Sequence, residues 1–461
     1  MGTHFHSGQA ESPFRTYDFR GVYGLDFTLE TVYRAGRHLP KLLNAERVLV
    51  GRDARLTSPE ISEALIRGLT DAGAGVVDMG KATTPMVYHF TAARGFDASV
   101  QVTASHNPPE YNGLKFSKRG ALPVGAHNGL RELEALVNAA KQPKPVAAGE
   151  TGNVETADFA DEFVHDLRPW QSDYSNVRFA VDASDGVSGL IAGKLFGKKA
   201  VLLNCEPDGN FPNHGPNPLE PESREQLRKT VLKNKLDLGV IFDGDGDRAM
   251  FVDEKGGFVQ SDFLIPVIAR HFLAREPGAI VAHDIRTSRG AIEALRRDGA
   301  VPVMWKVGHV FLKELIRDTR AVCGGELAGH YYFRDFHCCD SAEIATLIVL
   351  EQFANAKRRG ATFSQFIEGI RCYANSGEMN YGIKRKDEAI YAVRDAALAL
   401  GGTPLAVHAF DGLRYDFPRW WVNVRKSNTE PYVRLIIEAE TPGLLASVRQ
   451  TLAGALKPFA K

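Results

Sequence analysis

Hydrophobic and polar positions follow one another along this chain in an order that occurs three times. A short apolar run is followed by a polar turn, then by apolar residues at helical spacing, and then by a second apolar run. In the first instance residues 48–53 predict a buried strand, Ser58-Pro59 opens a helix, and residues 75–78 predict the next strand. The order recurs over residues 179–203 and 280–305. Each instance is a strand–helix–strand unit with a polar turn after its first strand.

Three such units predict three related α/β domains, because long segments with their own strands and helices separate them. A single α/β sheet with several crossover units is the alternative. After about residue 370 the pattern changes: residues 420–424 and 433–439 predict paired strands around a polar turn, and residues 441–460 a final helix. We therefore expect an α/β protein with three topologically related domains of mixed sheets and a small α+β C-terminal domain. The expected boundaries are 1–150, 151–255, 256–370 and 371–461, with a linker at residues 141–152.

The composition of the chain limits the kinds of molecule that we expect it to bind. A chain of 461 residues is too long for one hydrophobic core. Lys+Arg and Asp+Glu are both 56, so the balanced charge gives no reason to expect nucleic acid or a membrane as partner. A small anionic substrate would need local basic residues. The five cysteines lack metal-ligand spacing, the N-terminus lacks a signal-peptide pattern, and the longest apolar run is too short for a bilayer, so we expect a cytoplasmic protein.

A candidate nucleophile, Ser105, follows the strand predicted at residues 98–102. Pro108-Pro109 prevents a helix, and residues 111–113 are typical of a turn, so the serine is expected on a constrained loop that also carries Lys115. A hydrolase serine is the competing interpretation, but the glycine-flanked nucleophile elbow is absent. His106 is adjacent in sequence, and we expect it not to reach the hydroxyl of its neighbour.

Three carboxylates lie within five residues at Asp243, Asp245 and Asp247, between two predicted strands. Like charges so close together raise one another's pKa unless a cation lies between them, and hard oxygen ligands select Mg²⁺, Mn²⁺ or Ca²⁺. A calcium-binding EF-hand is disfavoured, because Arg248 stands where such a loop needs glycine and strands rather than helices flank it. A solvated acidic turn is the remaining alternative.

Two further loops carry groups that suit a phosphorylated sugar. Residues 324–330, after a strand expected at 321–323, place Glu326 and His330 on a glycine-rich turn suited to sugar hydroxyls. Residues 425–431 place a guanidinium, two hydroxyls and an amide on one tight loop, a set that suits phosphate oxygens. Arg20 and Arg286 are further candidates, although each alone is typical of a surface ion pair.

These motifs together resemble the α-D-phosphohexomutase superfamily, most closely the bacterial phosphomannomutase and phosphoglucomutase enzymes. The resemblance covers about residues 13–457 and rests on four motifs in family order: residues 103–115, 243–248, 325–330 and 425–431. It implies four domains around a central cleft. It also implies an intramolecular phosphotransferase that interconverts hexose 1-phosphate and hexose 6-phosphate through a phosphoserine and a hexose 1,6-bisphosphate.

Carried over to this sequence, the resemblance makes Ser105 the phosphorylated serine and joins it with Asp243, Asp245 and Asp247 as ligands of Mg²⁺. Arg20, Lys115 and His330 resemble residues with acid/base or transition-state roles. The expected substrate contacts are Tyr17, His106, Arg248, Arg286, His309, Glu326, Arg425, Ser427, Asn428 and Thr429. The partner is then a small phosphosugar, and the enzyme is expected to be a monomer or weak homodimer.

Two departures from the family pattern bear on the sugar. Leu327 and Ala328 stand where Met and Ser are usual, so one hydroxyl contact to the sugar is missing, and Arg286 replaces a common Lys with a different geometry. Leu327 and Asn428 point away from the amino-sugar mutases. We therefore expect mannose, and glucose beside it, as substrate; a phosphoglucosamine mutase or a non-catalytic phosphosugar-binding paralogue are the alternatives.

Overall fold

The computed structural model describes residues 11–139, 151–427 and 432–460. Within these ranges no helix has the length and apolar character needed to cross a membrane. Asn428 and Thr429, and residues 141–150 of the expected linker, lie outside the described residues. The chain divides into two compact units, the first formed by Met1–Val259 with His330–Phe363 and the second by Gln260–Gly329 with Ser364–Lys461.

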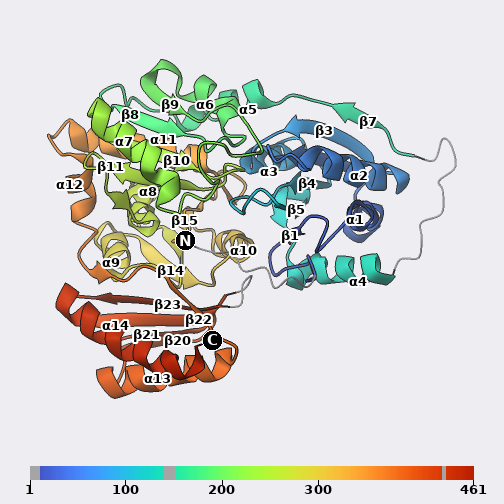
Figure 1. Ribbon diagram of the computed structural model, residues 1–461. Coiled ribbons are helices and arrows are strands. Elements are labelled where there is room, and N and C mark those ends of the chain that lie inside the picture. The colour runs from blue at the N-terminus through green and yellow to red at the C-terminus, as the bar shows by residue number, and fades with distance from the viewer. Residues whose placement is uncertain (1–10, 140–150, 428–431, 461) are drawn as a thin grey trace. The chain divides into compact units, whose positions relative to one another are not determined.

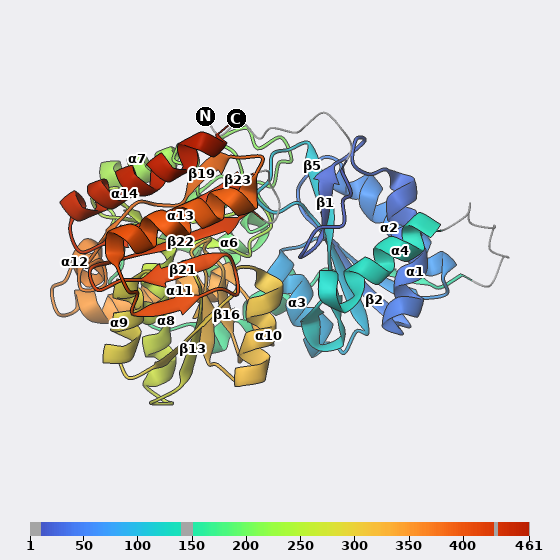
Figure 2. The same cartoon turned by 90° about the horizontal axis from the view of Figure 1, so that it is seen from below.

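The N-terminal part of the first unit is a mixed sheet with helices. Its strands are β1 (Phe19–Val22), β2 (Arg47–Arg52), β3 (Gly75–Lys81), β4 (Ala98–Val102), β5 (Tyr111–Lys118), β6 (Leu122–Pro123) and β7 (Val154–Thr156). Its helices are α1 (Leu29–Leu43), α2 (Ser58–Asp71), α3 (Thr84–Ala93) and α4 (Arg131–Ala139). The strand order is β1-β5-β4-β2-β3-β7, with β6 on β5. Helices α1, α2 and α4 lie on one side of these strands and α3 on the other (Figure 2).

The helical periodicity read from the sequence is confirmed in α2. The helix begins at Ser58 with Pro59 in its first turn and buries Ile61, Leu65 and Leu69. These side chains join a core that includes Val48 and other apolar residues of the parallel strands β2, β3 and β4. The first strand–helix–strand unit thus forms as predicted, and the polar turn after β2 contacts the loop that carries the serine.

The turn expected at residues 111–113 is wrong, because these residues open β5, which pairs antiparallel with β4 and β1. Gly113 lies opposite Arg20, and a Cβ atom at Gly113 would lie 2.2 Å from the Phe19 carbonyl oxygen. The glycine therefore permits close approach of two strands rather than a reversal of the chain. As a consequence Lys115 stands on a rigid strand and not on the serine loop.

The second mixed sheet of this unit consists of β8 (Phe179–Asp182), β9 (Ala200–Leu203), β10 (Leu238–Phe242), β11 (Ala249–Asp253) and β12 (Phe258–Val259), in the order β12-β11-β10-β8-β9. Its helices are α5 (Ala160–Asp166), α6 (Gly189–Leu195) and α7 (Glu225–Asn234). The unit also contains the antiparallel pair β16 (Tyr331–Phe333) and β17 (Cys339–Asp340), followed by the buried helix α11 (Ala342–Lys357). The loop between β10 and β11 carries the three aspartates.

The second unit contains the third strand–helix–strand arrangement. Parallel strands β13 (Ile280–Asp284), β14 (Val301–Trp305) and β15 (Cys323–Gly325) accompany helices α8 (Leu264–Leu273), α9 (Arg289–Arg297), α10 (His309–Thr319) and α12 (Phe363–Glu368). The strand expected at residues 321–323 is displaced by two residues, because Gly324 pairs with Ala282 and only glycine fits there. A Cβ atom at Gly324 would lie 2.9 Å from the Ala282 carbonyl oxygen.

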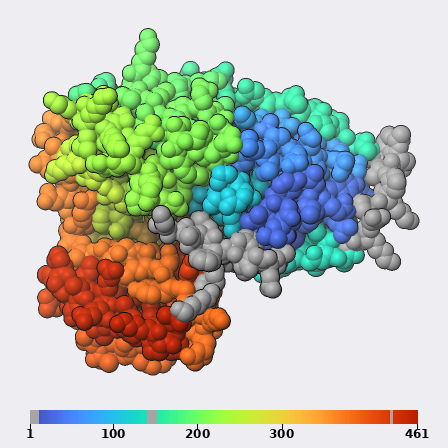
Figure 3. Space-filling view, viewed as in Figure 1, coloured from blue at the N-terminus to red at the C-terminus, as the bar shows by residue number. Residues whose placement is uncertain are grey.

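The C-terminal domain is an antiparallel sheet with two long helices. Its strands are β18 (Ala374–Asn375), β19 (Met379–Gly382), β20 (Ala406–His408), β21 (Leu413–Asp416), β22 (Trp420–Lys426) and β23 (Tyr432–Ala439), and its helices are α13 (Lys386–Gly401) and α14 (Pro442–Leu456). The helices lie side by side on one face of the sheet (Figure 1). In the space-filling view these residues form one continuous orange-to-red part of the surface (Figure 3). The predicted strand pair and final helix are confirmed.

Candidate active site

The loop after β4 holds Ser105 in a left-handed backbone conformation, with φ of 52°. The Ser105 N–H donates to Thr103 Oγ1 at 2.8 Å, and the Thr103 hydroxyl donates to Asp53 at 2.7 Å. Thr103, Ser105 and Asp53 are all buried. The polar turn after β2 therefore supports the serine loop, so the conformation of Ser105 is set by neighbours on a separate segment.

Arg55 is the main fixing residue of this loop, and sequence reasoning missed it. Its buried guanidinium is paired with Asp53 and donates to the carbonyl oxygens of Ser105, Asn107, Pro108 and Tyr111 at 2.6–3.0 Å. The polar turn after the first strand was visible in the sequence, but nothing there indicated which loop it would hold. The arginine supplies the partners that a buried irregular backbone requires.

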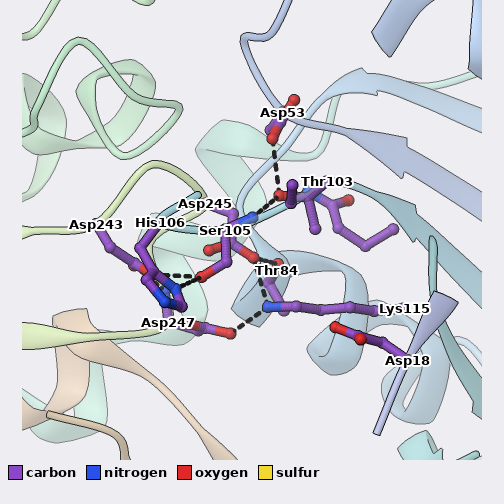
Figure 4. A network of polar contacts seen from close by, with 12 residues as sticks. Asp18, Asp53, Thr84, Thr103, Ser105, His106, Lys115, Asp243, Asp245 and Asp247 are labelled. Atoms are coloured by element: carbon purple, nitrogen blue, oxygen red, sulfur yellow. Dashed lines mark hydrogen bonds and ion pairs between the residues drawn. The ribbon is translucent and has the colours of Figure 1, made fainter. Parts of the chain in front are cut away.

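The Ser105 hydroxyl contacts groups from both sides of the site (Figure 4). It donates to Asp243 Oδ2 at 2.7 Å, and its Oγ lies 3.2 Å from His106 Nδ1. The expectation that His106 cannot reach its neighbour is wrong, because the left-handed turn at Ser105 brings the two side chains together. Burial and the nearby Arg248 and Arg20 guanidinium groups hold the pKa of His106 well below its usual range, so the ring is neutral.

The three aspartates lie close together at the edge of the second sheet. Asp243, Asp245 and Asp247 are buried, and each offers a carboxylate oxygen within 4.8 Å of the others. Burial, with the charges of Asp247 and Asp245, raises the pKa of Asp243 well above its ordinary value. Buried carboxylates this close together favour a cation between them.

Lys115 supplies the counter-charge that is present. Its Nζ atom, buried with its side chain, lies 2.6 Å from Oδ2 of Asp245 and 2.6 Å from Oδ2 of Asp247. Although burial opposes it, this ammonium lowers the pKa of Asp245, and the two carboxylates raise the pKa of Lys115. Among the described residues, the other oxygen of each aspartate, Oδ1, is buried without a hydrogen-bond partner. Orphaned hard oxygens in an acidic cluster fit a Mg²⁺ ion.

Arg20 joins the serine loop from β1. Its guanidinium pairs with Asp18 and donates to Asn107 Oδ1 at 2.8 Å and to the Ala104 carbonyl oxygen at 3.3 Å. Its Nε is buried and has no partner within the described ranges. The surface ion pair considered for Arg20 alone is therefore wrong. Tyr17, one of the expected substrate contacts, is half-buried and immediately precedes Asp18 in the sequence.

His330 and Arg248 complete this group within the first unit. Arg248 Nε donates to His330 Nε2 at 2.9 Å, so the ring proton resides on Nδ1, which lies 2.7 Å from Asp340 Oδ2. Asp340, on β17, is fully buried and was not among the sequence candidates. The site thus contains a histidine whose orientation and tautomer are fixed from both ends.

A second group of candidates lies in the second unit, around the end of β13. The Arg286 guanidinium pairs with Asp284 at 2.7 Å, and Asp284 also accepts the Leu327 N–H at 2.9 Å. Glu326 is buried and accepts the Gly308 N–H at 2.6 Å, which places it beside His309, the first residue of α10. Within this unit, Asp284 links Arg286 to the backbone of the sugar loop at Leu327.

Arg425 and Ser427 are the described residues of the predicted phosphate loop. Arg425, the residue before the last of β22, has a buried side chain, and its Nη2 donates to Glu378 at 3.0 Å. Ser427 is buried, and its N–H donates to the Tyr432 carbonyl oxygen at 2.9 Å, which closes the base of the loop. The Arg425 Nε is buried and lacks a partner in the described part of the chain. An unpaired guanidinium donor of this kind is suited to an anion.

Four family models match the chain in succession. They are described as phosphoglucomutase/phosphomannomutase alpha/beta/alpha domain I at residues 11–144, domain II at 157–257, domain III at 260–373, and the C-terminal domain at 378–455. The chain belongs to the phosphoglucomutase/phosphomannomutase family. The predicted membership and the predicted fold class of three α/β domains with a C-terminal domain are confirmed.

Relatives of this family match over nearly their full length. A phosphomannomutase of Escherichia coli (strain K12) is 36% identical over 452 residues, covering 95% of this chain and 98% of its own. A protein named phosphohexose mutases, from Xanthomonas campestris, is 35% identical over 448 residues, with 95% and 97% covered. A solved family structure from Burkholderia thailandensis has a TM-score of 0.84 at 32% identity and 98% coverage of both chains.

A structure described as a phosphomannomutase from Thermus thermophilus shares the fold at 22% identity, with a TM-score of 0.79. It covers 97% of this chain and 99% of its own. Membership makes the protein a hexose phosphate mutase, an intramolecular phosphotransferase of the isomerase class, and its acidic cluster fits the Mg²⁺ of the family. The roles of individual residues stay predictions.

Proposed function

We propose that this phosphohexomutase interconverts mannose 1-phosphate and mannose 6-phosphate, and the glucose phosphates beside them, through phospho-Ser105. The observation that carries the proposal is the Ser105 hydroxyl at 2.7 Å from Asp243, in a group whose only described ammonium, Lys115, bridges Asp245 and Asp247. A nucleophilic oxygen on an immobilised loop beside an acidic cation site is the arrangement that phosphoryl transfer requires.

In the first half-reaction the bond between phosphorus and Ser105 Oγ breaks, and a bond to a sugar hydroxyl oxygen forms. The hydroxyl proton passes to a basic group, for which His330 Nε2 is our candidate once Arg248 turns to the substrate. Lys115 and Arg20, both close to Asp245 or the serine loop, would stabilise charge on the transferring phosphoryl group. The resulting 1,6-bisphosphate reorients and returns its other phosphoryl group to Ser105.

Asp243, Asp245 and Asp247, with the Ser105 phosphate, would hold Mg²⁺, and Asp245 and Asp247 would do so through the Oδ1 atoms that lack partners among the described residues. A bound Mg²⁺ would neutralise charge on the phosphoryl oxygens. The three aspartates would hold the positive charge of the ion next to Ser105. Because they are buried, electrostatic interactions at this place are stronger than they would be in water. In the second unit, Glu326 and His309 would bind the sugar ring, and Arg286 would join Arg425, Ser427, Asn428 and Thr429 at the phosphate that does not react.

A coupled mutase assay with the 1-phosphates of mannose, glucose and glucosamine tests the proposal, with Mg²⁺ and catalytic bisphosphate supplied. We expect turnover of mannose and glucose phosphates and poor turnover of glucosamine phosphate. A preference for glucosamine phosphate would assign a phosphoglucosamine mutase instead, and no turnover of any of the three would indicate a non-catalytic paralogue.

We propose a cytoplasmic location and a monomeric or weakly dimeric state for the enzyme. The similarity to bacterial phosphomannomutases is compatible with the first. Fractionation and sedimentation velocity measure each directly.

A further inference from the structure

Three arginines of the second unit converge on a single carboxylate. Glu378 Oε1 lies 3.0 Å from Arg425 Nη2 and 3.6 Å from Arg286 Nη1, and Oε2 lies 2.9 Å from Arg434 Nη1. The Arg425 and Arg286 side chains are 3% and 5% exposed, so these ion pairs are largely shielded from water. Glu378 was not among the sequence candidates, because it lies 47 residues before Arg425 and in no motif.

The backbone around Glu378 is fixed at both ends. β18 pairs with β23 through Ala374 opposite Ala439, and β19 pairs with the same strand through Met379 opposite Leu435. The short segment between them is anchored by the Ser376 N–H, which donates to the Ile437 carbonyl oxygen at 2.9 Å. Glu378 stands directly before β19, and the sheet therefore determines where its carboxylate lies.

Arg425 and Arg434 also occupy a fixed place in this sheet. They lie opposite each other on β22 and β23, so two guanidinium groups leave neighbouring positions of one antiparallel pair. Like charges opposite each other destabilise a sheet. Glu378 accepts from both, and it thereby allows two cations to be placed side by side.

Arg286 reaches the same carboxylate from the region matched by the third family domain, whereas Glu378 and Arg425 belong to the region matched by the C-terminal domain. Asp284 neutralises Arg286 from the other side at 2.7 Å. Arg286 is thus held between two carboxylates, Asp284 and Glu378. Burial alone would raise the pKa of Glu378, but Arg425 and Arg286 lower it to about 2, so the group is ionised throughout the neutral range.

We propose that Glu378 is a positioning residue that fixes Arg425 and brings Arg286 to it, so that both cations are in place for the non-reacting phosphate of the substrate. The inference rests on the proposed role of Arg425 in binding that phosphate. Glu378 engages Arg425 through Nη2, while Nε remains without a described partner. A guanidinium held at one corner keeps a donor for the phosphate and loses little freedom when it binds.

The test is a double-mutant cycle on kcat and KM with mannose 1-phosphate and mannose 6-phosphate. Glu378→Gln keeps the shape of the side chain and removes its charge. We expect KM for both isomers to rise at least about tenfold while kcat changes less, because Arg425 then lacks its fixed partner. Glu440→Gln is the matched control, since it removes another Arg-paired carboxylate of the same domain, which contacts Arg419 on the surface. We expect its KM values to remain those of the parent enzyme.

The cycle separates positioning from simple stabilisation. If Glu378 acts mainly through Arg425, then Glu378→Gln in an Arg425→Ala background should raise KM far less than in the parent enzyme, because only Arg286 is then left for it to position. A full additional tenfold rise in that background would overturn the proposal, as would an unchanged or lower KM in the single variant. Circular dichroism and a thermal melt accompany each variant.

If Glu378→Gln does not fold, Glu378→Asp takes its place in the same cycle, since it keeps the charge but withdraws the carboxylate by one methylene. The proposal then expects a smaller KM rise that is again reduced in the Arg425→Ala background. Arg425→Ala alone reports on the proposed function: a normal KM there would reject the phosphate site itself. A raised KM in Arg425→Ala with a normal KM in both Glu378 variants would reject only the positioning role.

Discussion

The Ser105 hydroxyl lies 2.7 Å from Asp243 Oδ2, although 138 positions separate the two residues in the sequence. Ser105 lies on the loop after β4 of the N-terminal sheet, and Asp243 directly follows β10 of the next sheet. Their proximity means that any phosphate on Ser105 would lie against the acidic cluster, where it requires a compensating cation. The proposed phosphoryl donor and the acidic cluster proposed to hold its metal ion therefore come from two domains of the first unit.

We predict that Ser105 carries phosphate in the active enzyme. Treatment with hexose 1,6-bisphosphate should add one phosphate to the intact mass, and peptide mapping should locate it at Ser105. Ser105→Ala should lose the modification and nearly all activity, whereas Ser99→Ala, which removes a buried hydroxyl on β4 that contacts Thr91, should keep both. Phosphate found at another residue, or a fully active Ser105→Ala enzyme, would contradict the assignment.

The requirement of the activity for Mg²⁺ should rest on Asp245. Asp245→Asn removes a charged ligand and one of the two carboxylates that hold Lys115, so activity should fall at least about a hundredfold with the circular dichroism spectrum unchanged. Asp173→Asn, an exposed carboxylate paired with Arg358, serves as control and should behave as the parent. Activity that survives exhaustive chelation would refute the metal assignment.

Arg425→Ala should raise KM for hexose 1-phosphate and hexose 6-phosphate alike. Each isomer presents its non-reacting phosphate to this residue in turn, so a contact there contributes to both directions of the reaction. Steady-state kinetics in the two directions measure the effect, with Arg419→Ala as an exposed arginine control from the same domain. An increase confined to one isomer would show that Arg425 contacts only one orientation of the substrate.

Discrimination between mannose and glucose should be modest, on the order of tenfold to a hundredfold in kcat/KM, the range of one small contact. The two sugars differ only at C2, and Ala328 offers no hydroxyl in the sugar loop. Ala328→Ser should change the ratio by less than about a hundredfold. A parent ratio beyond about ten-thousandfold would show that C2 is recognised directly.

The stability of the second unit should depend on Asp262. Burial raises the pKa of this carboxyl to about 7, against an ordinary 3.8, so the folded protein holds a proton that the unfolded chain releases. The stability that this bound proton contributes to the folded protein is fully present below pH 3.8 and is lost as pH rises through about 7. Between pH 5 and pH 8 we expect a loss of roughly 2–3 kcal/mol from this group.

Asp262→Asn should abolish that loss, since the amide oxygen can still accept the Ser288 N–H and carries no charge. Chemical denaturation at both pH values gives the comparison, and Asp318→Asn, an exposed position of the same unit, is the control. An equal pH dependence in parent and Asp262→Asn protein would show that Asp262 is not the titrating group.

Local pattern predicted the repeated strand–helix–strand units well, because apolar spacing and a proline in a first helical turn act within a few residues. It misjudged residues 111–113, where Gly113 serves a close strand contact that only the partner strand explains. Motifs located the serine and the aspartates. They did not reveal Arg55, Asp340 or Glu378, since each acts on a segment distant in sequence and belongs to no short spacing pattern.

The Arg55 contacts have a consequence for how the active centre tolerates its own chemistry. Every loop atom that this guanidinium holds is a backbone carbonyl oxygen, at Ser105, Asn107, Pro108 and Tyr111. None of these atoms gains or loses charge when the serine is phosphorylated or dephosphorylated. The hydrogen bonds that hold the loop therefore do not involve the atoms that take up or lose the roughly two units of negative charge of each phosphoryl group. The loop can therefore keep one conformation while Ser105 donates a phosphoryl group in one half-cycle and accepts one in the next.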